Sequence, residues 1–252
     1  MAKPDGGGAG GLLLGANLLF HLEAMTFGSA DTGRRLGLAV VVFLITLIGG
    51  RIIPSFTRNW LAKRTPEHLP APVGRFDAAC LVAGGVALLA WAFHPEGGAV
   101  GGLLLVAAVL HAIRLSRWQG GRTGPSPLLL MLHVAYGFVP LGLAANAAAA
   151  FGLAAAAVGV HLLGIGAIGG MTVAVMMRAS LGHTGRALVA GPALTAAAAM
   201  VFLAALVRVC FPELVLAGVS GLWLAALLWV AGFSVFALRI GPYLARTSRK
   251  PT

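Results

Sequence analysis

The sequence predicts an all-α fold, a bundle of about eight transmembrane helices. Of the 252 residues, 59% are hydrophobic, 36 are glycine and only 10% are charged, whereas about 25% of an ordinary soluble domain is charged. The apolar runs are continuous and near the roughly 20 residues that one membrane-spanning helix needs. They also lack the alternation of barrel strands. The composition therefore excludes a soluble enzyme, a disordered chain and a nucleic-acid-binding domain.

Eight expected spans are separated by short segments rich in proline, glycine and basic residues. They cover approximately residues 10–27, 36–53, 76–93, 98–116, 127–148, 151–177, 187–209 and 214–240. Because the longest intervening loop, 54–75, is short, the sequence predicts one integral membrane domain over residues 1–252, with the lipid bilayer as its surroundings. Pro140 lies inside the fifth span, where it should kink the helix and free a backbone carbonyl.

The basic residues predict the orientation of these spans. Cytoplasmic loops of membrane proteins are enriched in Lys and Arg, and fifteen of the 18 basic residues fall on one side of the eight-span arrangement. Only Arg34, Arg35 and Arg208 fall on the other side. We therefore expect both termini in the cytoplasm. The fifteen residues are Lys3, Arg51, Arg58, Lys63, Arg64, Arg75, Arg114, Arg117, Arg122, Arg178, Arg186, Arg239, Arg246, Arg249 and Lys250.

Four histidines fall within the expected spans, at His21, His111, His133 and His161. Ionisable groups at membrane depth are costly and commonly mark a functional site. His111 and His133 lie roughly 8–9 Å from the cytoplasmic ends of consecutive spans, at 1.5 Å per residue. His21 and His161 lie near mid-membrane. All four are candidate metal or haem ligands, although each could instead hydrogen-bond to a backbone carbonyl or to a neighbouring helix.

Two polar motifs lie where the second and sixth spans reach the cytoplasmic side. The first is GGRIIPSFTRNW at 49–60, and the second is MTVAVMMRASLGHTGR at 171–186. We expect both at loops or helix ends, where Arg51, Arg58 and Arg178 are candidates for binding a carboxylate or phosphate, such as a haem propionate. The alternative is that these arginines anchor the helices at the membrane boundary.

The methionines of the second motif offer soft thioether ligands. Met171, Met176 and Met177 are suited to haem iron or cuprous copper, and Met171 is the candidate that we select. Methionine is also an ordinary residue of apolar cores.

These segments resemble the NnrS family of bacterial membrane proteins. The resemblance rests on NLLFHL at 17–22 and on the two motifs at 49–60 and 171–186, and it extends in order over nearly the whole chain. It implies a haem- and copper-containing protein of the bacterial inner membrane. It also implies a role in the response to nitric oxide and nitrosative stress, linked to denitrification, rather than catalysis of a named conversion.

The chain departs from the family pattern in length. Family members usually have about twelve spans and a WHxHEM-like motif in their N-terminal part, so this sequence resembles their C-terminal two-thirds. If the absent histidines bind metal, cofactor binding by this chain alone is in question. Two alternatives are a transporter or channel for a small metabolite or metal and a cytochrome b-type subunit. No span carries the two histidines thirteen or fourteen residues apart that the second alternative needs.

Overall fold

The computed structural model describes residues 7–216 and 218–245 and consists almost entirely of helices. Among these residues, eight helices are long and apolar enough to cross a membrane, which confirms the all-α polytopic fold. Residues Lys3, Arg246, Arg249 and Lys250, which we counted for orientation, lie outside the described residues. The elements are α1 Gly7–Phe27, α2 Asp31–Leu61, α3 Arg75–Phe93, α4 Gly98–Ser116, η1 Gly120–Thr123, α5 Pro127–Ala150, α6 Ala156–His161, η2 Leu162–Gly169, α7 Gly170–His183, α8 Gly191–Cys210, β1 Val215–Leu216, β2 Val219–Ser220 and α9 Gly221–Leu244.

The sixth span is one continuous helix with a change of geometry in its middle. It comprises α6, η2 and α7 over Ala156–His183, and η2 is a π-helix with the sequence LLGIGAIG. π-Helical turns are rare and often mark functional sites. The glycines in η2 permit close approach to other helices: a Cβ atom on Gly166 would collide with the ring of Phe138 on α5.

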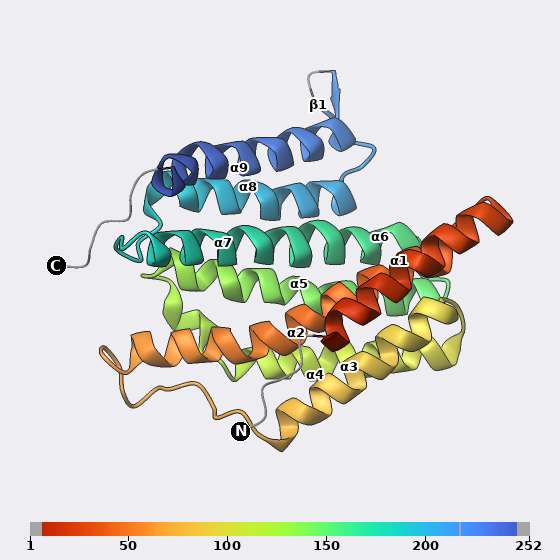
Figure 1. The fold of residues 1–252 in the computed structure, drawn as a ribbon, viewed down its shortest axis with the longest axis horizontal. Helices are drawn as coiled ribbons and strands as arrows, with labels where there is room; N and C mark the ends of the chain where they lie inside the picture. The colour runs from red at the N-terminus through yellow and green to blue at the C-terminus, as the bar shows by residue number, and fades with distance from the viewer. Residues whose placement is uncertain (1–6, 217, 246–252) are drawn as a thin grey trace.

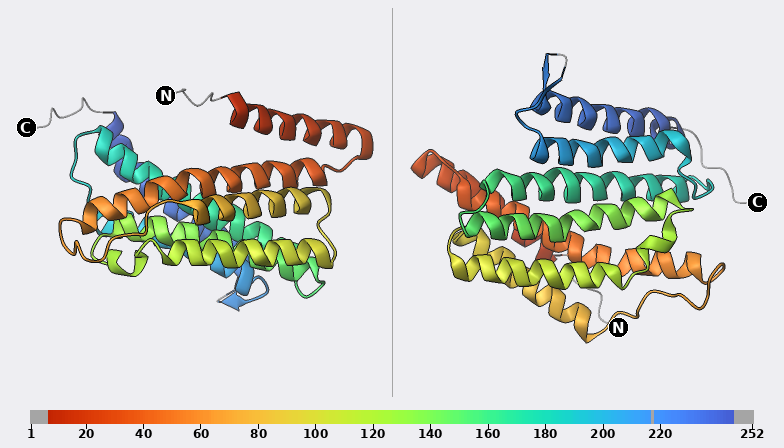
Figure 2. Two further views of the ribbon diagram at one scale, coloured as in Figure 1. Left: turned by 90° about the horizontal axis from the view of Figure 1, so that it is seen from below. Right: turned by 180° about the vertical axis from the view of Figure 1, so that it is seen from behind.

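The spans lie side by side, and α5 is the central helix (Figure 1). It packs against α4 and α2 on one side and against the sixth span and α8 on the other. Helices α8 and α9 pack together at one edge of the bundle, and α1 packs mainly against α2 along the outside (Figure 2). Large apolar side chains face outward, with Leu238 on α9 75% exposed and Trp223 69% exposed. Such an apolar exterior suits a lipid environment.

Several helices end at other residues than the sequence predicted. Helix α2 runs over Asp31–Leu61 rather than 36–53, and the sixth span covers Ala156–His183 rather than 151–177. Both motifs are therefore largely helical, and they form the C-terminal ends of α2 and of the sixth span rather than loops. Hydropathy falls at the first arginine of each motif, but the helical hydrogen bonds of the backbone continue to Leu61 in α2 and to His183 in α7.

Smaller differences occur at the other spans. Helix α5 ends at Ala150, α8 covers Gly191–Cys210, and α9 begins at Gly221, because residues 215–220 form a small antiparallel hairpin of β1 and β2. Pro140 is buried within α5, which continues on both sides of it.

Candidate functional site

A groove between α2 and α7 brings the two sequence motifs together. Its apolar part has a volume of about 260 Å³ and is lined by Gly49 and Ile52 of α2 and by Met171 and Val175 of α7. A second hollow of about 470 Å³ shares Ile52 and Val175 with the first. It continues along the two helices to Phe56, Arg178 and His183. We call these two adjoining hollows together the α2–α7 groove.

Helical periodicity explains why these residues share the groove. Gly49, Ile52 and Phe56 are spaced three and four residues apart, and Met171, Val175 and Arg178 have spacings of four and three, so each trio lies on one helix face. Gly49 has no side chain to fill the space. The groove is therefore apolar near Met171 and cationic near Arg178.

Arg178 is the charged group of the groove. Its guanidinium carbon lies 4.0 Å from the centre of the Phe56 ring, a cation–π contact that joins the two motifs. The side chain is half-buried, and among the described residues no carboxylate lies within 4.0 Å of it. A half-buried arginine without a carboxylate partner can bind an anion from outside the protein.

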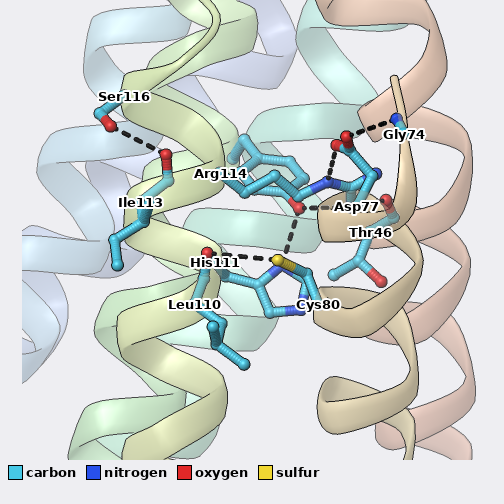
Figure 3. A network of polar contacts seen from close by, with 10 residues as sticks. Thr46, Gly74, Asp77, Cys80, Leu110, His111, Ile113, Arg114 and Ser116 are labelled. Carbon is cyan, nitrogen blue, oxygen red and sulfur yellow. Dashed lines mark hydrogen bonds and ion pairs between the residues drawn. The ribbon is translucent and has the colours of Figure 1, made fainter. Parts of the chain in front are cut away.

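A second polar cluster lies behind the α2 wall of the groove, centred on Arg114 of α4. Its Nε donates to Oδ1 of Asp77 at 2.8 Å, and its Nη1 donates to the Thr46 carbonyl at 2.9 Å and to the Tyr136 hydroxyl at 3.1 Å. Figure 3 shows Arg114 of α4 beside Asp77 of α3 and Thr46 of α2. Arg114 is only 1% exposed. We call Arg114, Asp77, Thr46, Tyr136 and His111 the Arg114 network.

The glycine pair at the start of the first motif accommodates this network. A Cβ atom on Gly50 would collide with the guanidinium of Arg114, and one on Gly49 would lie 3.5 Å from the Tyr136 ring. Gly49 also lines the groove on its other side. Gly49 of α2 thus lies against both the Arg114 network and the groove.

The histidines at matched depth, His111 and His133, both lie in the core on either side of the Trp118–Tyr136 ring pair. His111 Nδ1 is 2.8 Å from the Tyr136 hydroxyl, while its Nε2 is buried without a hydrogen-bond partner. A Cβ atom on Gly84 would lie 2.7 Å from that Nε2, so α3 closes this side of the ring. His133 Nδ1 contacts the Leu129 carbonyl at 2.9 Å.

The other two histidines lie away from these clusters. His161 accepts a hydrogen bond from Arg208 Nε at 3.3 Å, which joins α6 to α8. His21 is exposed on α1. The structure therefore does not bring the four histidines together, and none of them lines the α2–α7 groove.

The arginines of the first motif have different surroundings from Arg178. Arg58 donates to the carbonyl of Pro70 and so fixes the 62–74 loop. Arg51 is exposed on α2 and does not line the groove. No group of three His, Cys, Asp or Glu residues that could hold a metal ion occurs within the described parts of the chain.

Comparison with known proteins identifies the family. A family model described as NnrS protein matches residues 7–248. This chain belongs to the NnrS family. No curated protein and no solved structure matches it. The match confirms the resemblance drawn from the two motifs. In this NnrS chain each motif contributes residues to the lining of the groove.

Sequence reasoning missed three participants of these sites. Asp77 had no signal beyond being a lone acidic residue at the start of a span. Tyr136 lies on the helical face of His133, one turn away, a spacing that could have drawn attention to it. His183 stands within the second motif, but its position on the groove depends on α7 continuing to that residue.

Proposed function

We propose that this NnrS protein binds haem in the α2–α7 groove and acts in the response to nitric oxide and nitrosative stress associated with denitrification. The observation that carries this proposal is the groove's polarity, with an apolar wall near Met171 and a carboxylate-free Arg178 at the other end. Haem has the matching form, an apolar macrocycle with anionic propionates. A haem bound there supplies an iron centre that coordinates nitric oxide.

The groove limits which of its residues would bind the haem iron. Met171 and His183 both line it, but they are twelve residues apart on α7, about 18 Å along the axis at 1.5 Å per residue. They cannot both coordinate one iron. Met171, buried at 6% exposure, offers a thioether from the apolar wall and is the ligand that we favour. The thioether of Met171 would also be a soft ligand for copper, the second metal that the family resemblance implies.

Absorption spectroscopy of purified protein reconstituted with haem tests this proposal. We expect a Soret band that Met171→Ala shifts or abolishes, while Met176→Ala leaves it unchanged, because Met176 is 44% exposed and does not line the groove. His133→Ala, which alters a histidine outside the groove, serves as a second comparison. A Soret band lost in His133→Ala and unchanged in Met171→Ala would contradict the groove site.

We also propose the bacterial inner membrane as the location, with both termini in the cytoplasm. The uneven distribution of Lys and Arg supports this orientation. It puts the α3–α4 turn at His94–Gly97 outside. A cysteine introduced at Gly97 should then react with an impermeant thiol reagent in intact cells. Labelling of this cysteine only after cell lysis would indicate the opposite orientation.

A further inference from the structure

The hydrogen bond between Tyr136 and His111 has a defined direction. Arg114 can only donate, so its Nη1 donates to the Tyr136 oxygen at 3.1 Å. No other acceptor lies within hydrogen-bonding distance of the Tyr136 hydroxyl proton among the described contacts. A buried donor without an acceptor is costly. If Nδ1–H donated instead, both the phenolic proton and Nε2 would be unpaired, whereas donation by the hydroxyl leaves only the Nε2–H unpaired. The hydroxyl therefore donates to His111 Nδ1 at 2.8 Å, and the proton of the neutral imidazole is on Nε2.

This pair is enclosed by protein. Tyr136 and His111 are both 0% exposed, and the Trp118 ring packs edge-on against Tyr136 with 4.5 Å between ring centres. The phenol thus has one preformed proton acceptor in a site sealed from solvent. A phenol in such a site can lose an electron without retaining the positive charge on its oxygen, because its proton moves to the neighbouring base.

We propose that Tyr136 and His111 form a proton-coupled redox site. Tyr136 loses one electron to a one-electron oxidant, its O–H bond breaks, and the proton forms an N–H bond at His111 Nδ1. The products are a neutral tyrosyl radical and an imidazolium ion, and return of one electron and the proton restores the pair. The Arg114 guanidinium continues to donate to the radical oxygen, and Asp77 balances the arginine charge.

The position of the pair beside the groove indicates its redox partner. Tyr136 packs against Gly49, whose other side lines the groove. A haem held there by Met171 and Arg178 would supply the one-electron oxidant, and this part of the inference rests on the proposed function. The pair itself is built from residues of α4 and α5 and can be tested without any bound haem.

Ultraviolet photolysis of frozen haem-free protein, read by electron paramagnetic resonance, tests the pair. Light ejects an electron from a phenol into the frozen solvent, so no added oxidant is needed. The chain has only two tyrosines, Tyr136 and Tyr243, which makes Tyr243→Phe and Tyr136→Phe a matched pair of variants. We expect a tyrosyl radical coupled to a histidine nitrogen to persist in Tyr243→Phe and to be lost in Tyr136→Phe.

The role of His111 is measured in the Tyr243→Phe background, which leaves the Arg114 network intact. In D₂O we expect the radical to show coupling to an exchangeable deuteron and to a nitrogen that changes on ¹⁵N-histidine labelling. In His111→Gln the amide oxygen can accept the hydrogen bond but not the proton, so the radical signal should fall and the histidine coupling should disappear.

Two results would overturn the proposal. One is a signal that disappears in Tyr243→Phe, because the radical would then belong to Tyr243. The other is a Tyr136 radical without histidine coupling in the Tyr243→Phe protein. A haem-free measurement separates these failures from failure of haem binding, which the Soret band reports independently.

Discussion

Arg114 and Arg178 show two ways of keeping an arginine in a membrane protein. Arg114 is fully buried and donates to a carboxylate, a carbonyl and a hydroxyl from three other helices. Arg178 is half-buried, rests on Phe56 and has no carboxylate within 4.0 Å in the described parts of the chain. An arginine whose donors are bound by other helices, such as Arg114, holds those helices together. An arginine with donors that no carboxylate binds, such as Arg178, can bind a ligand.

The largest effect on stability is expected from breaking the ion pair between Arg114 and Asp77. Asp77→Ala leaves Arg114 as an uncompensated buried charge, which costs about 3–5 kcal/mol. Replacing both members, as in Asp77→Leu with Arg114→Met, should recover most of that loss. Unfolding of the detergent-solubilised variants measures both effects. A change below about 1 kcal/mol in Asp77→Ala would remove the structural role given to Arg114.

Arg178 should affect ligand binding rather than folding. Arg178→Lys keeps the charge but loses the planar fork, and haem should bind about 1.5–3 kcal/mol more weakly, the worth of one charged hydrogen bond. Haem retention during detergent washing measures the change, with Arg178→Ala beside it and Arg51→Lys as the matched control. Retention equal to the wild type in Arg178→Lys would indicate that Arg178 is only a membrane anchor.

Gly50 tests how closely α2 must approach the Arg114 network. Gly50→Ala places a methyl group against the guanidinium and should destabilise the fold by about 1–3 kcal/mol, as overpacking does. Gly102→Ala on α4 is the control, because its added Cβ meets nothing within 4 Å. Equal thermal stability of the two variants would mean that the network tolerates displacement.

The smallest effect is expected at Arg58, the arginine that fixes the 62–74 loop. Arg58→Ala removes one donor to the Pro70 carbonyl and should cost about 0.5–1.5 kcal/mol. Because Arg58 does not line the groove, haem retention should not change. Proteolysis within the loop and a haem titration measure the two expectations. Loss of haem binding would extend the site to Arg58.

Hydropathy, together with the proline and glycine residues between the spans, predicted the helix bundle well. The Arg114 network was not predicted, because its polar contacts join segments that are far apart in the sequence. The ranges 76–93 and 98–116 agree with α3 and α4 to within a residue. His111 and His133, for which matched depth predicted a shared site, each lie against a different ring of the Trp118–Tyr136 pair, and the shared metal or haem site stays a prediction. The partners of Arg114, however, lie 37 and 68 residues away at Asp77 and Thr46.

The candidate groove was predictable only in part. The two motifs and the residues Met171 and Arg178 were identified from the sequence, but their meeting depends on α2 and α7 being adjacent. Neither the residue spacing within the motifs nor the composition of the chain indicates that these two helices are adjacent. Arg51 and Arg58 had the same chemistry as Arg178, and only the direction of each side chain distinguishes them.

The π-helical stretch η2 sets the rotational phase between the two halves of the sixth span. An α-helix turns about 100° per residue, and a π-helical turn, with its i→i+5 hydrogen bonds, holds about one residue more. If Leu162–Gly169 were wound as regular α-helix, α7 would be rotated by about that angle relative to α6. Met171 and Arg178 would then face away from α2, although hydropathy and span length would scarcely change. The π-helical turn therefore sets the angle between the two helices. It allows α6 to pack on α5 while Met171 and Arg178 of α7 line the groove.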